Sequence, residues 1–243
     1  MTDAARAARF PDLKTVLALS RVSNLPTVWM NVLTAALLSG EATYATVVLL
    51  AASLSAFYCG GMVLNDLFDR SIDAREQPFR PIPAGRASVE QARLLATLLL
   101  GAGLALLCLA PHRSALLPGL VLLAMIWAYD RWHKGHPSSV LLMAGTRFMV
   151  FVVTASAIAG SVSGIVLFAG LLQLLYTLLV TVVARYENSR GERYSFPLIP
   201  WMLSAMPIVD GVVLAIVANG WWLLVGLLAA ALTRFGQRYV RGD

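Results

Sequence analysis

The sequence is poor in charged residues. Asp, Glu, Lys and Arg together make up 13% of its 243 residues, whereas a typical soluble domain carries about 25%. Apolar residues make up 58% and lie in long blocks instead of short periodic stripes. This composition excludes an ordinary soluble domain and predicts an all-α fold, a polytopic bundle of transmembrane helices.

Cysteine is also scarce. Cys59 and Cys108 are the two cysteines, they lie far apart, and each sits inside an apolar block. No pair has the spacing of a zinc site, and two cysteines cannot build a disulfide framework. We expect both to be small buried apolar side chains.

The sequence has an excess of positive charge but no basic face. The formal net charge is +6, and the Lys and Arg residues lie between the apolar blocks. A nucleic-acid-binding surface would gather them on one face with interleaved aromatics. We therefore exclude nucleic acid as a partner and expect a lipid bilayer instead.

Eight apolar blocks approach the roughly 20 residues that a membrane-spanning helix needs. The fourth and eighth are short. The predicted spans are residues 23–39, 44–64, 91–110, 115–130, 138–159, 162–184, 197–217 and 220–234.

The basic residues are concentrated on one side of these spans. The loops on one side hold only Arg113, and Arg147 lies within the fifth span. All the others lie in the remaining loops and the ends: Arg6, Arg9, Lys14, Arg21, Arg70, Arg75, Arg80, Arg86, Arg93, Arg131, Lys134, Arg185, Arg190, Arg193, Arg234, Arg238 and Arg241. Because basic loops stay in the cytoplasm, both termini and the long loops are predicted to be cytoplasmic, with an even number of spans.

The expected organisation is one transmembrane domain over residues 23–234. A cytoplasmic segment over residues 1–22 precedes it, with an interfacial helix near residues 10–20, and a tail over residues 235–243 follows. A bacterial inner membrane is the expected location.

A charged run begins where the second apolar block ends. It reads NDLFDRSIDAREQPFRPIPAGR over residues 65–86. On a helix, the spacing of Asn65, Asp66, Asp69 and Asp73 brings their side chains to one face. Three carboxylates and an amide would repel one another without a cation, and hard oxygen ligands favour Mg²⁺.

Mg²⁺ in proteins commonly also binds substrate phosphates. Arg75 and Arg80 follow the acidic residues, and guanidinium groups suit phosphate oxygens. The alternative is a solvated loop of mixed charge. The absence of a spacer after the apolar block favours a magnesium–diphosphate site at the mouth of a bundle.

The pattern N-D-x-x-D-x-x-x-D at the end of the second span resembles the first aspartate-rich motif of the UbiA-type intramembrane prenyltransferases. Residues 80–86, RPIPAGR, and residues 21–27, RVSNLPT, resemble further segments of that family, and an EboC-like subgroup is one candidate within it. The resemblance implies a UbiA-like bundle that moves an isoprenyl group from its diphosphate to a small acceptor, with Mg²⁺ as cofactor. It implies that Asp66, Asp69 and Asp73 are the catalytic, metal-holding residues.

The resemblance also implies further diphosphate contacts. Asn24 lies in the segment that opens the first span, and Lys134 follows Tyr129-Asp130 in the loop after the fourth span. We expect both to contact the diphosphate.

The second aspartate-rich motif of such a protein should follow the sixth span, and here the sequence departs from the pattern. The segment reads ARYENSRGER over residues 184–193. Glu192 keeps its charge, Glu187 is a nearby substitute, and Asn188 offers a carbonyl oxygen; these are the expected metal ligands on this side. Arg185 stands where a carboxylate is expected and is predicted to contact the diphosphate directly. We expect one strong magnesium site instead of two.

Arg147 lies about seven residues into the fifth span. A charge at that depth is costly unless it is paired. It is predicted to reach the diphosphate or an aspartate, and the alternative is a side chain that extends to the membrane surface. Tyr58, Tyr176 and Tyr186 could stabilise an allylic cation or anchor the membrane interface.

Two other functions remain. The CDP-alcohol phosphotransferases share the ingredients, but the order of their motif is absent. A non-catalytic protein that binds isoprenyl diphosphate or lipid would also explain the altered second motif. The acceptor and the length of the prenyl chain cannot be read from the sequence.

Overall fold

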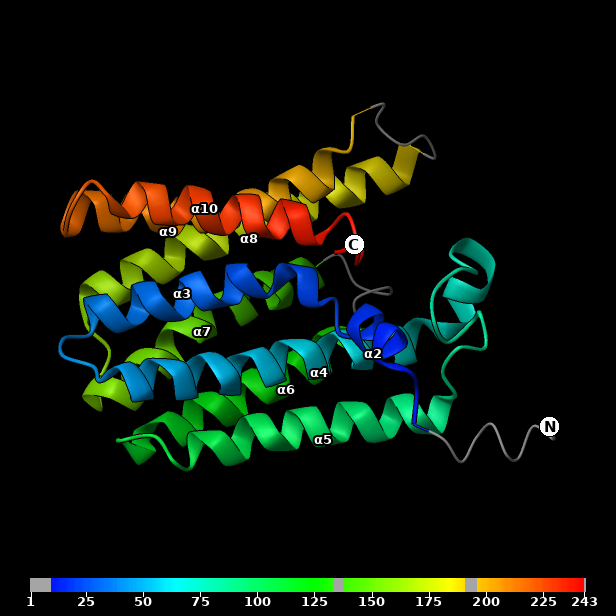
Figure 1. Ribbon diagram of the computed structural model, residues 1–243, viewed down its shortest axis with the longest axis horizontal. Coiled ribbons are helices and arrows are strands. Elements are labelled where there is room, and N and C mark those ends of the chain that lie inside the picture. Colours follow the sequence, from blue (N-terminus) through cyan, green and yellow to red (C-terminus); the bar gives the residue numbers. More distant parts are fainter. Residues whose placement is uncertain (1–9, 133–137, 191–195, 243) are drawn as a thin grey trace.

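The computed structural model describes residues 10–132, 138–190 and 196–242. All secondary structure in these ranges is helical. The long helices run side by side along the longest axis of the molecule (Figure 1). This confirms the predicted all-α bundle.

Eight helices build the body of the bundle. They are α3 (Leu25–Leu38), α4 (Tyr44–Glu76), α5 (Val89–Leu107), α6 (Leu116–Trp132), α7 (Ser139–Ala159), α8 (Gly164–Arg190), α9 (Leu198–Val217) and α10 (Trp222–Gly236). Three short elements complete the described chain: α2 (Leu13–Leu19), η1 (Val22–Asn24) and η2 (Arg113–Ala115).

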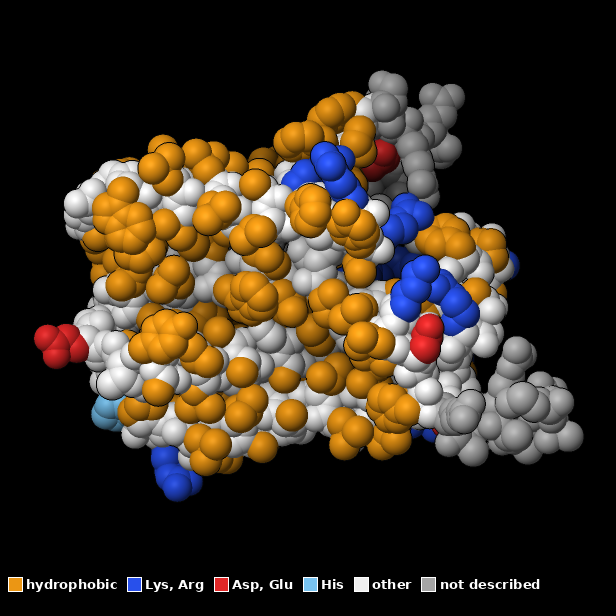
Figure 2. All heavy atoms as spheres, viewed as in Figure 1, with side chains coloured by type: hydrophobic (Ala, Val, Ile, Leu, Met, Phe, Trp, Pro, Cys, Tyr) orange, Lys and Arg blue, Asp and Glu red, His pale blue; other side chains and the backbone are white. Residues whose placement is uncertain are grey.

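Six of the described helices are long and apolar enough to cross a membrane, namely α4, α5, α6 with η2, α7, α8 and α9. The first and eighth predicted spans correspond to the shorter apolar helices Val22–Leu38 and Trp222–Gly236. The chain is therefore a multi-pass membrane protein, and the count of eight stays a prediction. Apolar side chains cover the flank of the bundle, whereas Lys and Arg gather at one end (Figure 2).

The longest helix, α4, extends well beyond its apolar part. Its 33 residues span about 50 Å at 1.5 Å per residue, against a hydrocarbon core of about 30 Å. Arg70 and Arg75 were predicted to lie in a loop after residue 64, and this prediction was wrong: both lie in α4. No proline interrupts the charged run until Pro78, and the residue before a proline disfavours helical geometry, so the helix ends at Glu76.

Helix α2 lies beside the charged end of α4 (Figure 1). Asp12 caps it by accepting a hydrogen bond from the backbone N–H of Thr15 at 3.1 Å. The hydrogen bonds from Thr15 hold the pKa of the Asp12 carboxyl below its usual value. The end of α10 reaches the same end of the bundle, which we call the motif end.

Helices α9 and α10 pack with their backbones in close contact. A Cβ atom on Gly226 would lie 2.7 Å from the carbonyl oxygen of Pro207, and one on Gly211 would lie 3.0 Å from the Cα of Gly226. Small residues allow such approach between apolar helices. The contact directs the end of α10 toward the start of α3.

Candidate functional site

The acidic residues of the charged run lie on one buried face of α4. The exposed fractions are 3% for Asp66, 6% for Asp69 and 2% for Asp73, and Asn65 is 8% exposed. A buried carboxylate is costly unless other groups compensate its charge. The structure therefore places these residues on a buried helix face and not in a solvated loop.

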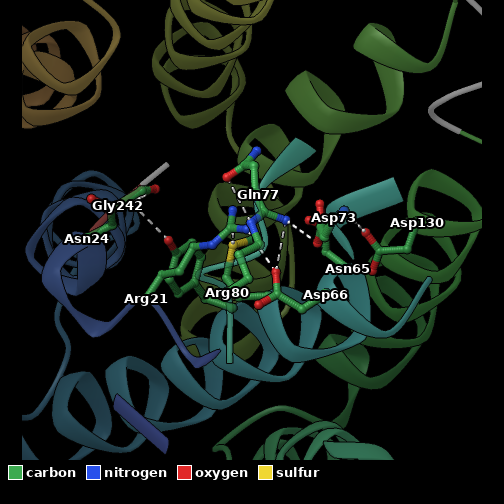
Figure 3. A network of polar contacts seen from close by, with 11 residues as sticks. Arg21, Asn24, Asn65, Asp66, Asp73, Gln77, Arg80, Asp130 and Gly242 are labelled. Atoms are coloured by element: carbon green, nitrogen blue, oxygen red, sulfur yellow. Dashed lines mark hydrogen bonds and ion pairs between the residues drawn. The ribbon is translucent and has the colours of Figure 1, made fainter. Parts of the chain in front are cut away.

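Two arginines pair with this face (Figure 3). Arg21, which precedes η1, donates to Asp66 Oδ1 at 2.9 Å. Arg80, in the segment after α4, lies 2.7 Å from Asp73 Oδ2 and 3.4 Å from Asp66 Oδ1. Arg80 thus bridges Asp66 and Asp73, which lie about two helical turns apart with Asp69 between them.

The neighbouring wall is the end of α6. Asn65 donates to Asp130 Oδ1 at 3.2 Å, which joins α4 to α6.

The donor set on α4 is chemically suited to Mg²⁺, since it consists of carboxylate and amide oxygens. Its present arrangement is not a preformed cage. Among the described residues, no three Asp, Glu, His or Cys side chains form a group that could hold a metal. An incoming cation would share or replace the contacts that Arg21 and Arg80 make with Asp66 and Asp73.

An apolar chamber opens inward from Asp130 and Asn65. Its cavity volume is about 60 Å³, and its lining is mostly apolar. Helices α3, α4, α6 and α7 line it. The lining residues are Val28, Leu54, Phe57, Tyr58, Gly61, Met62, Leu122, Ile126, Tyr129, Asp130, Met143, Thr146, Arg147 and Val150.

Arg147 lies at the deep wall of this chamber and does not extend to the membrane surface. It is 8% exposed and donates to Asn31 Oδ1 at 3.3 Å. Asn31 in turn donates to Asp210 Oδ2 at 2.6 Å. The Arg147 guanidinium also lies over the Tyr58 ring, 5.4 Å from its centroid. The charge is thus compensated by a buried polar chain across α7, α3 and α9.

The α8 side contributes a cation. Arg185 donates to Ser139 Oγ at 2.7 Å, which fixes its guanidinium at the start of α7. Glu187 lies in the same turn of α8. Glu187 forms no metal-holding group with the α4 aspartates within the described ranges. The predicted ligand Glu192, the predicted contact Lys134 and the side chain of Asn188 lie outside the described residues.

The two other predicted diphosphate contacts are Arg75, which is exposed, and Asn24, which is buried. Arg75 is exposed in the last turn of α4 and has no ion pair with an aspartate in the described chain. Asn24 is 4% exposed, and its side-chain amide donates to Tyr58 Oη at 3.1 Å. Both assignments as diphosphate ligands stay predictions.

Sequence reasoning missed several residues of the site. Arg21 was treated only as an orientation charge and as part of a resembling segment, and Asp130 was named only as a neighbour of Lys134. Asn31 carried no signal beyond being a polar residue inside an apolar block. Arg21, placed directly before the first apolar block, could have been weighed as a partner for the acidic run.

A second, basic chamber adjoins Asp66 on the outer side. We call it the basic chamber; its volume is about 770 Å³. It lies between α2, the segment after α4 and the segment after α10. Its lining residues are Leu13, Lys14, Leu17, Ala18, Arg21, Asp66, Phe79, Arg80, Pro81, Arg86, Arg238, Tyr239, Val240 and Arg241.

The fold and the site together define a multi-pass membrane protein with a charged mouth above an apolar chamber. The sequence pattern of the UbiA prenyltransferase family matches residues 24–241. The chain belongs to this family, as the resemblance of its first motif predicted. The EboC-like assignment stays a prediction.

Among curated proteins, the chain is similar to digeranylgeranylglyceryl phosphate synthases of archaea. It is 31% identical to that of Methanothrix thermoacetophila over 184 residues, 73% of this chain and 67% of the relative. It is 42% identical to that of Ignicoccus hospitalis over 91 residues, 37% of this chain and 30% of the relative. The chain thus spans from about a third to two thirds of the length of these relatives.

Solved structures share the fold. A digeranylgeranylglyceryl phosphate synthase structure superimposes with a TM-score of 0.64 at 20% identity, over 93% of this chain and 94% of the other. A UbiA homologue from Archaeoglobus fulgidus bound to GPP and Mg²⁺ gives a TM-score of 0.61 at 18% identity, over 91% and 85%. At these identities the likeness is one of fold.

Proposed function

We propose that the protein transfers an isoprenyl group from an isoprenyl diphosphate to a small acceptor and releases diphosphate. The observation that carries this proposal is the buried aspartate face of α4 directly above an apolar chamber. The face suits a cation and a diphosphate, and the chamber suits a hydrocarbon chain. Membership of the prenyltransferase family and a relative's structure with GPP and Mg²⁺ support it.

Asn65, Asp66, Asp69 and Asp73 would hold Mg²⁺. When bound, the ion neutralises the diphosphate as it leaves. Arg21 and Arg80 already lie at this face and would take up the diphosphate oxygens while the aspartates turn to the metal. Arg185 would contact the diphosphate from the α8 side.

The bond from the first prenyl carbon to the diphosphate oxygen breaks, and that carbon bonds to the acceptor, which loses a proton. The walls of the chamber exclude water, so the cationic carbon is protected from hydrolysis. The acceptor proton needs a base near the mouth, and Asp130 and the released diphosphate are the candidates there.

We further propose that the acceptor carries a phosphate head group. The relatives named above are digeranylgeranylglyceryl phosphate synthases. The basic chamber adjoins Asp66 and has six Lys and Arg residues against one carboxylate: Lys14, Arg21, Arg80, Arg86, Arg238 and Arg241. An anionic head group bound there would place its chain end near the α4 face.

The direct test is release of diphosphate by purified protein with Mg²⁺ and radiolabelled geranylgeranyl or farnesyl diphosphate. Acceptors with and without a phosphate group should be compared. We expect release that depends on Mg²⁺ and on a phosphate-bearing acceptor. Absence of release with every chain length and acceptor would refute an enzymatic function.

The alternative is a non-catalytic protein that binds isoprenyl diphosphate or lipid. The pairing of Arg80 with both Asp66 and Asp73 favours it, because these contacts occupy oxygens that a metal needs. Tight Mg²⁺-dependent binding of the diphosphate without turnover would support this alternative.

The orientation is part of the proposal. The motif end carries most of the basic residues, and we propose that it faces the cytoplasm, with eight spans and a single transmembrane domain over residues 23–234. Arg75→Cys and Arg113→Cys place a cysteine at exposed positions on opposite predicted sides of the membrane. Labelling of each variant from one side of the membrane would test this placement.

A further inference from the structure

The wall of the apolar chamber contains a charge that is fixed in place. Arg147 is 8% exposed and lines the chamber from α7. Its Nη1 donates to Asn31 Oδ1 at 3.3 Å, and Asn31 donates to Asp210 Oδ2 at 2.6 Å. Asn31 and Asp210 are 0% and 1% exposed, so bulk water does not compete for these hydrogen bonds. The guanidinium is therefore held from α3 and α9.

The same guanidinium lies against Tyr58 on α4. Its central carbon is 5.4 Å from the centroid of the Tyr58 ring, which is within the range of cation–π attraction. Tyr58 is itself fixed, because its hydroxyl accepts a hydrogen bond from Asn24 at 3.1 Å. Arg147 and Tyr58 thus form a rigid pair in the chamber wall, and we call it the Arg147–Tyr58 pair.

The pair lies about two helical turns below the aspartate face. Asn65 and Tyr58 are seven residues apart on α4, which is about 10 Å along the helix axis. A fully extended chain advances about 3.5 Å for every three bonds, so the eight bonds of two isoprene units cover about 9 Å. A ten-carbon chain on a diphosphate at the aspartate face therefore ends near the pair, and a twenty-carbon chain extends beyond it.

The chamber above the pair is adaptable. Its cavity volume is about 60 Å³, so a chain enters only by displacing side chains. Met62 on α4 and Met143 on α7 line the part between the motif end and the pair, and methionine side chains change conformation easily. Arg147 lacks this freedom, because moving it would break its contacts with Asn31 and Tyr58. The upper part can open for a chain while the pair stays in place.

Hydrocarbon that packs against the guanidinium is destabilised. Within the described chain Arg147 makes one hydrogen bond, to Asn31, although a guanidinium carries five N–H donors. A chain that covers the remaining donors separates them from any polar partner. Moving additional hydrocarbon from lipid into the chamber brings no compensating gain, because lipid tails are equally apolar. A chain that ends before the pair is thus the more stable ligand.

We propose that Arg147 is a specificity-determining residue that limits the isoprenyl chain to about ten carbons, and that Asn31 and Asp210 are the residues that position it. The relatives described above are named for the longer geranylgeranyl group, so this chain differs from them in substrate length. The inference rests on the proposed function, because it assigns a chain length to the proposed isoprenyl diphosphate. It places Arg147 at the far end of the substrate and not at the diphosphate.

The first test measures binding of two unreactive analogues, geranyl and geranylgeranyl thiodiphosphate, to the full chain in nanodiscs with Mg²⁺. The wild type should bind the geranyl compound about tenfold to a hundredfold more tightly, because the longer chain covers the guanidinium donors. Arg147→Met, which substitutes an unbranched apolar side chain, should bring the two affinities within about threefold. Equal binding of both compounds by the wild type would overturn the inference.

A second variant guards against a folding defect. Arg147→Met leaves buried Asp210 without a nearby positive charge, so it is also measured together with Asp210→Asn, which removes the uncompensated charge. The double variant should lose the length preference as well. Thr154→Val is the control, because it removes a buried hydroxyl about two turns further along α7 and outside the chamber lining. The control should keep the preference, and a preference that persists in both Arg147 variants would contradict the inference.

The positioning role of Asn31 is tested by its dependence on Arg147. Asn31→Ala should reduce the length preference in the wild type, because the guanidinium is then free to turn away. In the Arg147→Met background the same change should have no effect on the preference, since coupled residues are non-additive. A change of equal size in both backgrounds would show that Asn31 does not act through Arg147.

Binding and turnover together separate this inference from the enzymatic function. A length preference that depends on Arg147, without release of diphosphate from the natural compounds, would support the inference and refute turnover. Equal kcat/KM for geranyl and geranylgeranyl diphosphate would support the enzyme and overturn the inference. Absence of Mg²⁺-dependent binding of either analogue would refute both.

Discussion

The end of α4 and the end of α8 differ in charge. On α4, three buried aspartates and Asn65 share one helix face. On α8, the position where a carboxylate is expected holds Arg185, fixed by a 2.7 Å hydrogen bond to Ser139.

This difference indicates that the proposed diphosphate site is asymmetric. One wall offers oxygen ligands for a cation, and the other offers a guanidinium that binds phosphate oxygens directly. A guanidinium carries a fixed charge and needs no metal to hold a diphosphate. The altered second motif is thus compatible with a functional site in which a metal ion and an arginine both bind the diphosphate.

The largest effect is expected at Asp69. Asp69→Ala should abolish Mg²⁺-dependent binding of isoprenyl diphosphate and lower turnover by about a thousandfold, because the metal stabilises the leaving group. Binding of a fluorescent geranyl diphosphate analogue, titrated with and without Mg²⁺, measures this. Glu76→Ala, which removes an exposed carboxylate at the end of α4, is the matched control. Unchanged metal-dependent binding in Asp69→Ala would remove α4 as the anchor.

The next effect concerns the pairing of Arg80. Arg80→Gln leaves Asp73 buried without its partner, and losing one side of a buried pair costs about 3–5 kcal/mol. We expect a thermal midpoint several degrees lower, measured by tryptophan fluorescence in detergent.

Mg²⁺ should recover more of this loss in Arg80→Gln than it adds to the wild type, because no arginine then competes for Asp66 and Asp73. Equal stabilisation of both proteins by Mg²⁺ would mean that the cation does not use these carboxylates.

A smaller effect is expected on the α8 wall. Arg185→Gln should weaken isoprenyl diphosphate binding about tenfold, equal to about 1.4 kcal/mol, without moving the Mg²⁺ midpoint. Isothermal titration calorimetry at two Mg²⁺ concentrations distinguishes a change in diphosphate affinity from a change in the Mg²⁺ midpoint. Arg93→Gln, exposed at the same end of the bundle, serves as control. A shift of the Mg²⁺ midpoint in Arg185→Gln would show that Arg185 also affects metal binding, against the proposed asymmetry.

The smallest effect is expected at Tyr58. Tyr58→Phe removes the hydrogen bond from Asn24 but keeps the ring beneath Arg147. A loss of about 1 kcal/mol would lower kcat/KM a few-fold. Steady-state kinetics check this, and a loss beyond a hundredfold would assign the hydroxyl a direct chemical role.

The sequence predicted the helical bundle because long apolar blocks can bury their backbone polar groups only as helices in a bilayer. It also predicted that Asn65, Asp66, Asp69 and Asp73 share one face, since helical spacing decides that. The end of α4 was misplaced by 12 residues, because the apolar block ends at residue 64 while the helix continues to Glu76.

Contacts between distant segments could not be predicted. Arg21 and Asp66 are 45 residues apart, and Asn24 and Gly242 are 218 apart. Helical periodicity gives the direction of a side chain but not the helix that it meets. The Arg147–Asn31–Asp210 chain shows this well, because it joins three helices through polar residues that look isolated in the sequence.

The most direct test of the asymmetric site is the number of metal ions bound with the substrate. Mn²⁺ can replace Mg²⁺, and electron paramagnetic resonance of the complex with a non-hydrolysable isoprenyl diphosphate analogue counts bound ions. The asymmetric site predicts one tightly bound Mn²⁺ per chain, lost in Asp69→Ala and retained in Arg185→Gln. Two spin-coupled Mn²⁺ ions of equal affinity would contradict it.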